Sequence, residues 1–395
     1  MKRFFAYIIL SFFLLLLPTG QASANNNDSI RLSLLTCAPG EEIYSLFGHT
    51  AIRYENSSQG IDVVFNYGLF SFNTPNFIFR FSLGETDYQL GATDYERFAA
   101  EYAFFGRSVW QQTLNLTDEE KTELIRLLQE NYRPENRVYR YNFFYDNCAT
   151  RPRDKIEESI AGKVIYPAEP QDGSLTFRDI VHQYCKGHPW ARFGIDLCIG
   201  SEADQPITQR QMMFAPFYLM DAFDGAQIKG DSIQRPLITA NELVVDATPE
   251  PDESDWMPTP LQCSLLLFIL TAAATIYGIR RRTGLWGIDL FLFGIAGIVG
   301  CVLAFLALFS QHPAVSSNFL LLVFHPGQLL FLPYIIYCVR KGKKCWYLTL
   351  NLAVLTLFIV LFPVIPQRFD FAVVPLALCL LIRSVSNLIV TSKKK

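Results

Sequence analysis

The last third of the chain is a series of apolar segments, and this feature most restricts the possible fold. Five such segments lie at about 261–279, 285–309, 319–339, 346–363 and 370–390. Each is long enough to cross the hydrocarbon core of a bilayer as a helix, which takes roughly 20 residues. We therefore predict an all-α transmembrane domain of five helices over residues 261–395.

Basic residues predict the orientation of these helices. The clusters Arg280–Arg282, Arg340–Lys344 and Lys393–Lys395 follow the first, third and fifth apolar segments. Loops rich in Lys and Arg remain in the cytoplasm. The C-terminus is therefore expected in the cytoplasm, and the part before residue 261 on the outer side of the inner membrane.

The N-terminus gives an independent indication of export. Two basic residues follow Met1, an apolar run extends from Phe4 to Pro18, and Ala22-Ser-Ala24 resembles a cleavage site. This pattern is typical of a signal peptide over residues 1–24. An uncleaved anchor helix is the alternative.

Between these parts we expect an exported domain and a linker. Residues 246–260 contain four prolines and five acidic residues, which is typical of a linker. Residues 25–245 are then the exported domain. The formal net charge of the chain is −3, which gives no electrostatic reason to expect a nucleic-acid partner.

The exported part begins with three predicted strands, followed by a predicted helix. The strands are Ser29–Cys37, Ser45–Tyr54 and Ile61–Tyr67, and the helix runs from a capping box at Thr117 to Asn131. Alternation along a strand places His49 and Arg53 on one face. The second and third strands form a hairpin, so Asn66 on the returning strand can reach His49. This mixture predicts an α+β domain.

Cys148 is the candidate nucleophile. It lies in a polar, aromatic segment, Tyr141–Asp154, just before the helix-like run Lys155–Ile160. The positive end of a helix dipole favours a thiolate. The candidate base is His49, since the two residues need to meet in space and not in sequence. A buried structural cysteine is the alternative interpretation.

The other cysteines suggest no metal site. Five of the nine lie in or beside the apolar segments, and no paired spacing typical of zinc is present. Cys185 and Cys198 are close enough in sequence to form a disulfide, which would leave Cys37 and Cys148 unpaired. A Cys37–Cys148 bridge would disable the nucleophile.

Two further stretches remain open to interpretation. The stretch Phe70–Leu90 is rich in aromatic residues, which suits either a core or a surface that docks on lipid and takes acyl chains. Residues 175–221 are expected to form a mostly helical and looped cap over the site.

Three motifs together resemble one family. They are FGHTAIRYE at 47–55, VVFNYGLFSF at 63–72 and YNFFYDNCATRPRD at 141–154. The chain resembles the Lnb family of Bacteroidetes lipoprotein N-acyltransferases from about Leu32 to the C-terminus. The periplasmic domain of that family is similar to circularly permuted papain-like folds, as in lecithin:retinol acyltransferase, in which the histidine strand precedes the nucleophile helix.

The resemblance implies an acyl transfer without metal or soluble cofactor. A phospholipid would donate an acyl chain to Cys148 as a thioester. The α-amino group of a diacylglyceryl-modified lipoprotein cysteine would then accept it. The enzyme would be a multi-pass protein of the inner membrane with its catalytic domain in the periplasm.

Further site residues are assigned as hypotheses. Asn66 is the candidate to orient His49, with Tyr67 as the alternative, and Asn142 can donate its side-chain amide to an oxyanion. Arg53 and Arg151 are candidates to hold a headgroup phosphate. The candidate substrate-binding residues together are Arg53, Asn142, Asn147, Arg151, His312 and Asn318, of which the last two resemble a family motif in a predicted outer loop.

Three other functions remain open from the sequence. A membrane-tethered cysteine peptidase or cell-wall amidase would use the same two catalytic residues but would need a polar, open groove. A lipid hydrolase would pass the acyl group to water. A non-catalytic membrane scaffold would not depend on Cys148.

Overall fold

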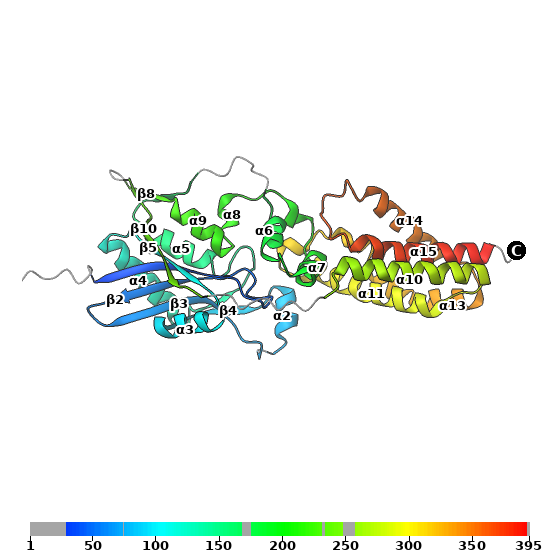
Figure 1. Cartoon of the computed structure of the whole chain (residues 1–395), viewed down its shortest axis with the longest axis horizontal. Helices are drawn as coiled ribbons and strands as arrows, with labels where there is room; N and C mark the ends of the chain where they lie inside the picture. Colours follow the sequence, from blue (N-terminus) through cyan, green and yellow to red (C-terminus); the bar gives the residue numbers. More distant parts are fainter. Residues whose placement is uncertain (1–28, 74, 168–174, 231–233, 248–256, 393–395) are drawn as a thin grey trace, which may run out of the picture.

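The computed structural model describes residues 29–392 except 74, 168–174, 231–233 and 248–256. The predicted signal peptide and most of the predicted linker lie outside these residues. Figure 1 shows a domain built on a β-sheet at one end and a helical bundle at the other, with the C-terminus at the far end of the bundle.

The main sheet is antiparallel and has the strand order β10-β5-β1-β2-β3-β4-β6. Its strands are β1 (Ile30–Cys37), β2 (His49–Asn56), β3 (Ile61–Leu69), β4 (Asp87–Asp94), β5 (Val109–Leu114), β6 (Val138–Arg140) and β10 (Ile238–Val245). The three strands expected from the sequence are β1, β2 and β3. A mixed α and β domain with an antiparallel sheet is therefore confirmed.

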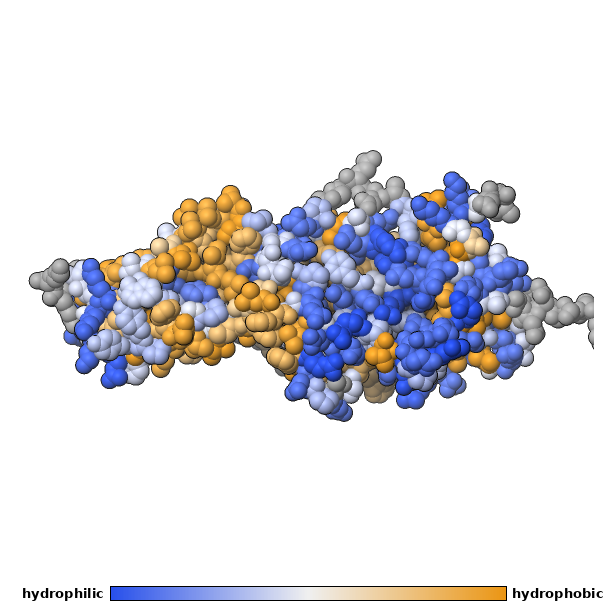
Figure 2. Space-filling model, turned by 180° about the vertical axis from the view of Figure 1, so that it is seen from behind, coloured by the Kyte–Doolittle hydropathy of each residue, from blue (hydrophilic) through white to orange (hydrophobic). Residues whose placement is uncertain are grey.

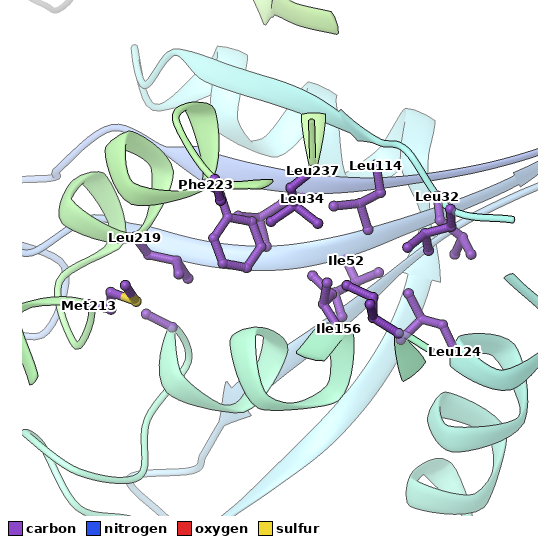
Figure 3. Close-up of a cluster of buried hydrophobic side chains, with 14 of the residues drawn as sticks. Leu32, Leu34, Ile52, Leu114, Leu124, Ile156, Met213, Leu219, Phe223 and Leu237 are labelled. Carbon is purple, nitrogen blue, oxygen red and sulfur yellow. The ribbon is translucent and has the colours of Figure 1, made fainter. Parts of the chain in front are cut away.

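Alternating side chains give the sheet two apolar faces. Leu34 and Ile52 belong to one buried cluster, whereas their neighbours Leu35 and Ala51 belong to another. Helices α4, α5 and α9 contribute to the first cluster, part of which Figure 3 shows, and α3 contributes to the second. These helices are α3 (Tyr95–Phe104), α4 (Asp118–Tyr132), α5 (Thr150–Ser159) and α9 (Pro216–Asp224). The capping box at Thr117 starts α4 as the sequence predicts.

A helical segment joins the sheet domain to the bundle. It consists of α6 (Phe177–Tyr184), α7 (Pro189–Cys198), η1 (Ser201–Asp204) and α8 (Gln209–Met212), and a small second sheet lies nearby, made of β7 (Lys163–Ile165), β8 (Gln227–Lys229) and β9 (Gln234–Pro236). Phe214 and Phe177 pack in one cluster with Phe47 and Phe144, which flank His49 and Cys148 in sequence. The helical segment therefore packs against both the loop before His49 and the loop before Cys148. The sequence predicted a cap over the site from these residues.

A buried guanidinium organises this joint. Arg178 has no exposed surface, and it donates to Asp196 at 2.7 Å and to Asp204 at 2.8 Å. It also donates to the carbonyls of Ile199 and Gly200, at 3.1 Å each. A buried charge is tolerated when it is paired and hydrogen-bonded in this way.

The outer loops of the bundle bind the same joint. The Gly200 amide donates to the Ala314 carbonyl at 2.7 Å, and Gln367 Nε2 donates to the Ile199 carbonyl at 3.2 Å. Arg368 pairs with Asp204 at 2.9 Å. Both loops therefore lie on the side of the bundle that faces the sheet domain.

Among the described residues, three helices are long and apolar enough to cross a membrane, namely α10 (Pro260–Arg281), α11 (Trp286–Phe309) and α15 (Val373–Ser392). The shorter helices α13 (Leu332–Lys341) and α14 (Trp346–Leu361) are bent by 112° and would count together as a fourth span. Figure 2 shows an apolar surface over much of this half and a mainly hydrophilic one over the sheet domain.

The expected apolar span over 319–339 is not one continuous helix. The structure divides this stretch into η3 (Phe319–Leu322), α12 (Pro326–Leu330) and α13. Pro326 has no N–H for a continuous helix and becomes the first residue of α12. Gly300 of α11 lies against the backbone of His325, where a β-carbon would collide. The first, second and fifth expected spans are thus full-length helices, whereas the third and fourth are shorter helices.

Replacing Arg178 by alanine is expected to destabilise the protein by about 3 kcal/mol, because it removes the fully buried partner of two buried carboxylates. Thermal unfolding of the full chain in detergent measures this change. The control is Arg126→Ala, which breaks an exposed pair with Glu123 at 2.7 Å. Its expected cost is much smaller, because solvent screens this exposed pair. Equal losses of stability in the two variants would contradict the role given to Arg178.

Candidate active site

His49 and Asn66 meet across adjacent strands. His49 is the first residue of β2, and its Nε2 lies 2.5 Å from Asn66 Oδ1 of β3. An amide oxygen only accepts hydrogen bonds, so Nε2 carries the proton and Nδ1 keeps a free lone pair. The imidazole is thereby held in one tautomer with an acceptor available for a thiol proton.

Cys148 lies at the start of α5, as expected. Asn147 accepts from the amides of Ala149 and Thr150 at 2.8 and 3.0 Å, which caps the first turn of the helix. The sulfur of Cys148 receives the backbone N–H groups of Thr50 and of Cys148 itself. Because Thr50 directly follows His49, this contact places the sulfur at the end of β2 that carries the histidine.

Gly68 makes the space in which the two groups converge. A β-carbon built on this glycine would lie 3.4 Å from Cys148 Cβ and 3.9 Å from His49 Cε1. Gly68 has a φ of 94°, a conformation that disfavours other residues. The register of β3 against β4 shifts between Asn66 and Leu69, as at a β-bulge. The sequence contained this glycine, and an isolated glycine within a strand is a usual sign of a bulge or a close approach.

Burial keeps both groups neutral. It raises the pKa of the Cys148 thiol to about 11, although the amides of Thr50 and Cys148 lower it. Burial also lowers the pKa of His49 to about 4. The positive charge of Arg107 lowers this pKa further, whereas the hydrogen bond with Asn66 raises it. The expectation that the helix start would favour a thiolate is therefore wrong, because desolvation outweighs it. Burial thus favours the neutral thiol and the neutral imidazole, although both side chains keep some accessible surface.

Tyr139 is a site residue that the sequence did not indicate. Its ring is buried, and an ideal β-carbon on Gly68 would lie 4.0 Å from its hydroxyl. Among the described residues, this buried hydroxyl has no hydrogen-bond partner. The phenol therefore borders the volume between Cys148 and His49 with a free donor. Only the pairing of β6 with β4 brings it there.

Tyr67, the alternative partner of the histidine, has a different contact. Its hydroxyl donates to Asn131 Oδ1 of α4 at 2.7 Å. Asn66 and Tyr67 are neighbours in β3, so they point to opposite faces of the sheet. Since Asn66 reaches His49, the tyrosine is directed into the core beneath α4.

The two arginines proposed for a phosphate are already paired. Arg53 makes a bidentate contact with Asp62 at 2.8 and 2.6 Å and lies over the ring of Tyr95. Arg151 makes a bidentate contact with Asp146 at 2.6 and 2.8 Å. Binding a phosphate would require each to give up a carboxylate, so both are better explained as structural.

Asn142 and Asn147 also have structural duties. Asn142 Oδ1 accepts from the amides of Phe144 and Tyr145 at 3.2 and 3.3 Å and closes a turn. Asn147 caps α5 and donates through Nδ2 to the carbonyls of Phe143 and Phe214. All four hydrogen-bonding positions of the Asn147 amide are occupied, so it positions Cys148 instead of binding substrate.

His312 and Asn318 tie the bundle to the sheet domain. His312 Nε2 lies 3.0 Å from the carbonyl of Phe81. Asn318 donates to the carbonyl of Leu197 at 2.7 Å and accepts from the amide of Leu320. Neither contact involves Cys148 or His49, so the structure does not bring these residues into the site.

All nine cysteines lie in the described part of the chain, and all are free thiols. The bridge that the sequence allowed between Cys185 and Cys198 is therefore not formed. Cys37 is paired across the strands with His49 and is fully buried, which raises the pKa of its thiol to about 12. Cys37 is thus a core residue. The described residues include no group of three His, Cys, Asp or Glu side chains that could hold a metal ion.

The fold and the site define an exported domain that is attached to a membrane bundle and brings a cysteine, a histidine and an asparagine together. The Lnb N-terminal periplasmic domain matches residues 20–182, and the Lnb transmembrane domain, described as having five spans, matches residues 252–395. The chain belongs to the Lnb family, and it has a periplasmic N-terminal domain and a multi-pass transmembrane domain. Searches of curated proteins and of solved structures returned no match.

The neutral resting pair predicts a pH dependence. The rate of Cys148 alkylation by iodoacetamide is expected to rise about tenfold per pH unit from about pH 7 to pH 10, because only the thiolate reacts and the thiol loses its proton late. Mass spectrometry of the Cys148 peptide measures the rate, over the range in which the circular dichroism is unchanged. A rate that is already constant near pH 7 would indicate an ion pair and contradict this assignment.

Proposed function

We propose that this protein is a lipoprotein N-acyltransferase that uses Cys148 as its nucleophile. Membership in the Lnb family supports the activity. The observation that carries the assignment of residues is the convergence of Cys148 and the Asn66-bound His49 over Gly68. The order of histidine strand and nucleophile helix also agrees with a permuted papain-like arrangement.

In the first step, Cys148 attacks the ester carbonyl of a phospholipid. His49 Nδ1 takes the thiol proton as the C–S bond forms, since both groups begin neutral. The tetrahedral intermediate collapses with cleavage of the ester C–O bond. The same proton passes from His49 to the leaving alkoxide, which gives a thioester and a lysophospholipid.

The developing oxyanion needs donors near Cys148. The backbone amides of Thr50 and Cys148 already point at the sulfur, and the Tyr139 hydroxyl is a buried donor without a partner in the described chain. Burial raises the pKa of Tyr139, which keeps its proton in place. Donors arranged in advance around the forming charge give the largest stabilisation of such a transition state.

In the second step, the α-amino group of a diacylglyceryl-modified cysteine attacks the thioester. The C–N bond forms and the C–S bond breaks, while His49 accepts a proton from the amine and returns it to the Cys148 sulfur. An amide is more stable than a thioester, so the step runs downhill. The aromatic surroundings of the site favour the amine over water.

The arrangement suits substrates that remain in the membrane. The outer loops that bind the α6–α7 joint lie at the end of the bundle nearest the sheet domain, whereas the described basic clusters Arg280–Arg282 and Arg340–Lys344 lie at the C-terminal ends of α10 and α13. This distribution supports a cytoplasmic C-terminus under the positive-inside rule. The proposed domains are residues 25–245 as the catalytic domain and 261–395 as the membrane domain, joined by the linker at 246–260.

The decisive experiment is mass spectrometry of a lipoprotein N-terminal peptide from a host that lacks its own N-acyltransferase. Expression of the intact protein is expected to add one N-linked acyl chain, and the Cys148→Ala variant is expected to add none. Cys301→Ala serves as the matched control, since Cys301 is an exposed cysteine of α11. Acylation by Cys148→Ala would contradict the mechanism, and no acylation by any form would favour a peptidase, a hydrolase or a scaffold.

Tyr139→Phe isolates the proposed oxyanion donor. The variant is expected to slow formation of the acyl-enzyme about a hundredfold, the usual effect of losing one such donor. Its Tm should remain unchanged, because the hydroxyl gives up no hydrogen bond to the described chain. Tyr54→Phe is the control, since the Tyr54 hydroxyl accepts only from Asn56 in the described chain, at 3.2 Å. An unchanged rate in Tyr139→Phe would remove this tyrosine from the mechanism.

A further inference from the structure

Five aromatic rings form a column between the membrane side of the sheet domain and the Cys148 loop. In order they are Phe81, Phe77, Phe70, Tyr88 and Tyr141. Successive ring centroids are 6.3, 5.4, 4.8 and 4.1 Å apart, and successive planes differ by 21°, 18°, 20° and 15°. Rings stacked in this way present a continuous line of apolar edges.

The inner end of the column lies beside the nucleophile. Tyr141 opens the loop that leads to Cys148, and Phe70 follows Gly68 by two residues. Tyr88 is the cross-strand partner of Tyr139, so both side chains lie on the same face of the sheet, and the Tyr139 hydroxyl borders the space over Gly68 next to Cys148. The column thus ends at the volume in which the thiol and His49 converge.

The outer end lies against a membrane-spanning helix. Phe77 and Phe81 belong to the short helix α2 (Phe77–Leu83), which packs on α11. The rings of Phe79 and Phe305 are 5.5 Å apart. Phe305 lies about one turn before the end of α11 at Phe309, so this contact is at the depth of the outer leaflet.

The remaining face of α2 is apolar and uncovered. Ile78 is 78% exposed and Phe79 is 56% exposed, and nearby Phe72 is 62% exposed. Arg80, the charged residue of the helix, points back to the domain, where it pairs with Asp87 at 3.0 Å. An apolar face of this kind, continuous with a membrane-spanning helix, is typical of an element that lies in the bilayer interface.

We infer that α2 lies in the outer leaflet and that the column guides one acyl chain of the donor phospholipid from the leaflet to the Cys148 thiol. This inference rests on the proposed function and specifies the entry of its donor substrate. The chain leaves the leaflet beside Ile78, lies along the ring edges, and presents its ester carbonyl to the sulfur. The headgroup remains near the membrane surface, so no dedicated phosphate clamp is required.

Ile78→Glu tests the membrane end of the route. The full-length variant is expected to form acyl-Cys148 about tenfold more slowly from vesicles of palmitoyl-oleoyl phosphatidylethanolamine, because it loses the burial of one apolar side chain and places a charge in the leaflet. With p-nitrophenyl butyrate, a soluble ester that needs no leaflet, its rate should equal that of the wild type. The control is Ile165→Glu, which alters a residue that is 40% exposed on β7 of the small second sheet.

Phe70→Ala tests the column itself. It is expected to slow the reaction with p-nitrophenyl palmitate in micelles several-fold more than the reaction with p-nitrophenyl butyrate, because only the longer chain reaches along the rings.

Each outcome decides the inference. If Ile78→Glu reacted with vesicles at the wild-type rate, the inference would be overturned. It would also be overturned if the variant lost the same fraction of its rate on vesicles and on p-nitrophenyl butyrate, because this would indicate a purely structural role for α2. If Phe70→Ala slowed the reactions with p-nitrophenyl palmitate and p-nitrophenyl butyrate by the same factor, the column would have no role in guiding the acyl chain. If the wild-type protein formed no acyl-Cys148 from either ester, the proposed function would itself fail, a result distinct from failure of the route alone.

Discussion

The position of the candidate site depends on one buried guanidinium. Arg178 holds two carboxylates and two backbone carbonyls at the joint between the sheet domain and the membrane bundle. Two outer loops of the bundle bind the same joint through Gln367 and Arg368. A buried ion network of this kind adds little net stability relative to an apolar core, but it tolerates only one arrangement of its partners. The aromatic residues of the joint pack against Phe47 and Phe144, so the joint supports the segments that lead to His49 at the start of β2 and to Cys148 before α5.

At the site itself, burial dominates over every other electrostatic effect. The helix start and two amide donors favour a negative sulfur, yet desolvation keeps Cys148 a thiol and His49 neutral. In the proposed mechanism, charge would appear only when an acyl donor arrives, next to the Tyr139 hydroxyl, which has no partner in the described chain. In the proposed mechanism, the same burial that disfavours the thiolate would also limit the access of water to a thioester.

The sequence was sufficient for the features that depend on local pattern. Alternation and a polar turn predict the hairpin of β2 and β3, and hence the contact between Asn66 and His49. Features that depend on distant pairings were not predictable. Tyr139 is the example, since it reaches the site only through the pairing of β6 with β4. The carboxylate partners of Arg53 and Arg151 lie only nine and five residues away, but the sequence did not show that these pairs occupy the arginines. The break in the segment 319–339 was underestimated, because hydropathy does not reveal the close approach of Gly300 to His325.

The contacts of the two outer loops have a mechanical consequence. They attach the sheet domain to the bundle at several points, so they restrict its movement relative to the bundle. For the proposed acyl transfer, this attachment would hold Cys148 at one height along the membrane normal. An ester carbonyl that can rise to that height would be within reach whatever headgroup it carries, whereas one buried more deeply would be excluded. Selection by depth in this manner would allow a single site to serve two lipid-anchored substrates that share no polar group.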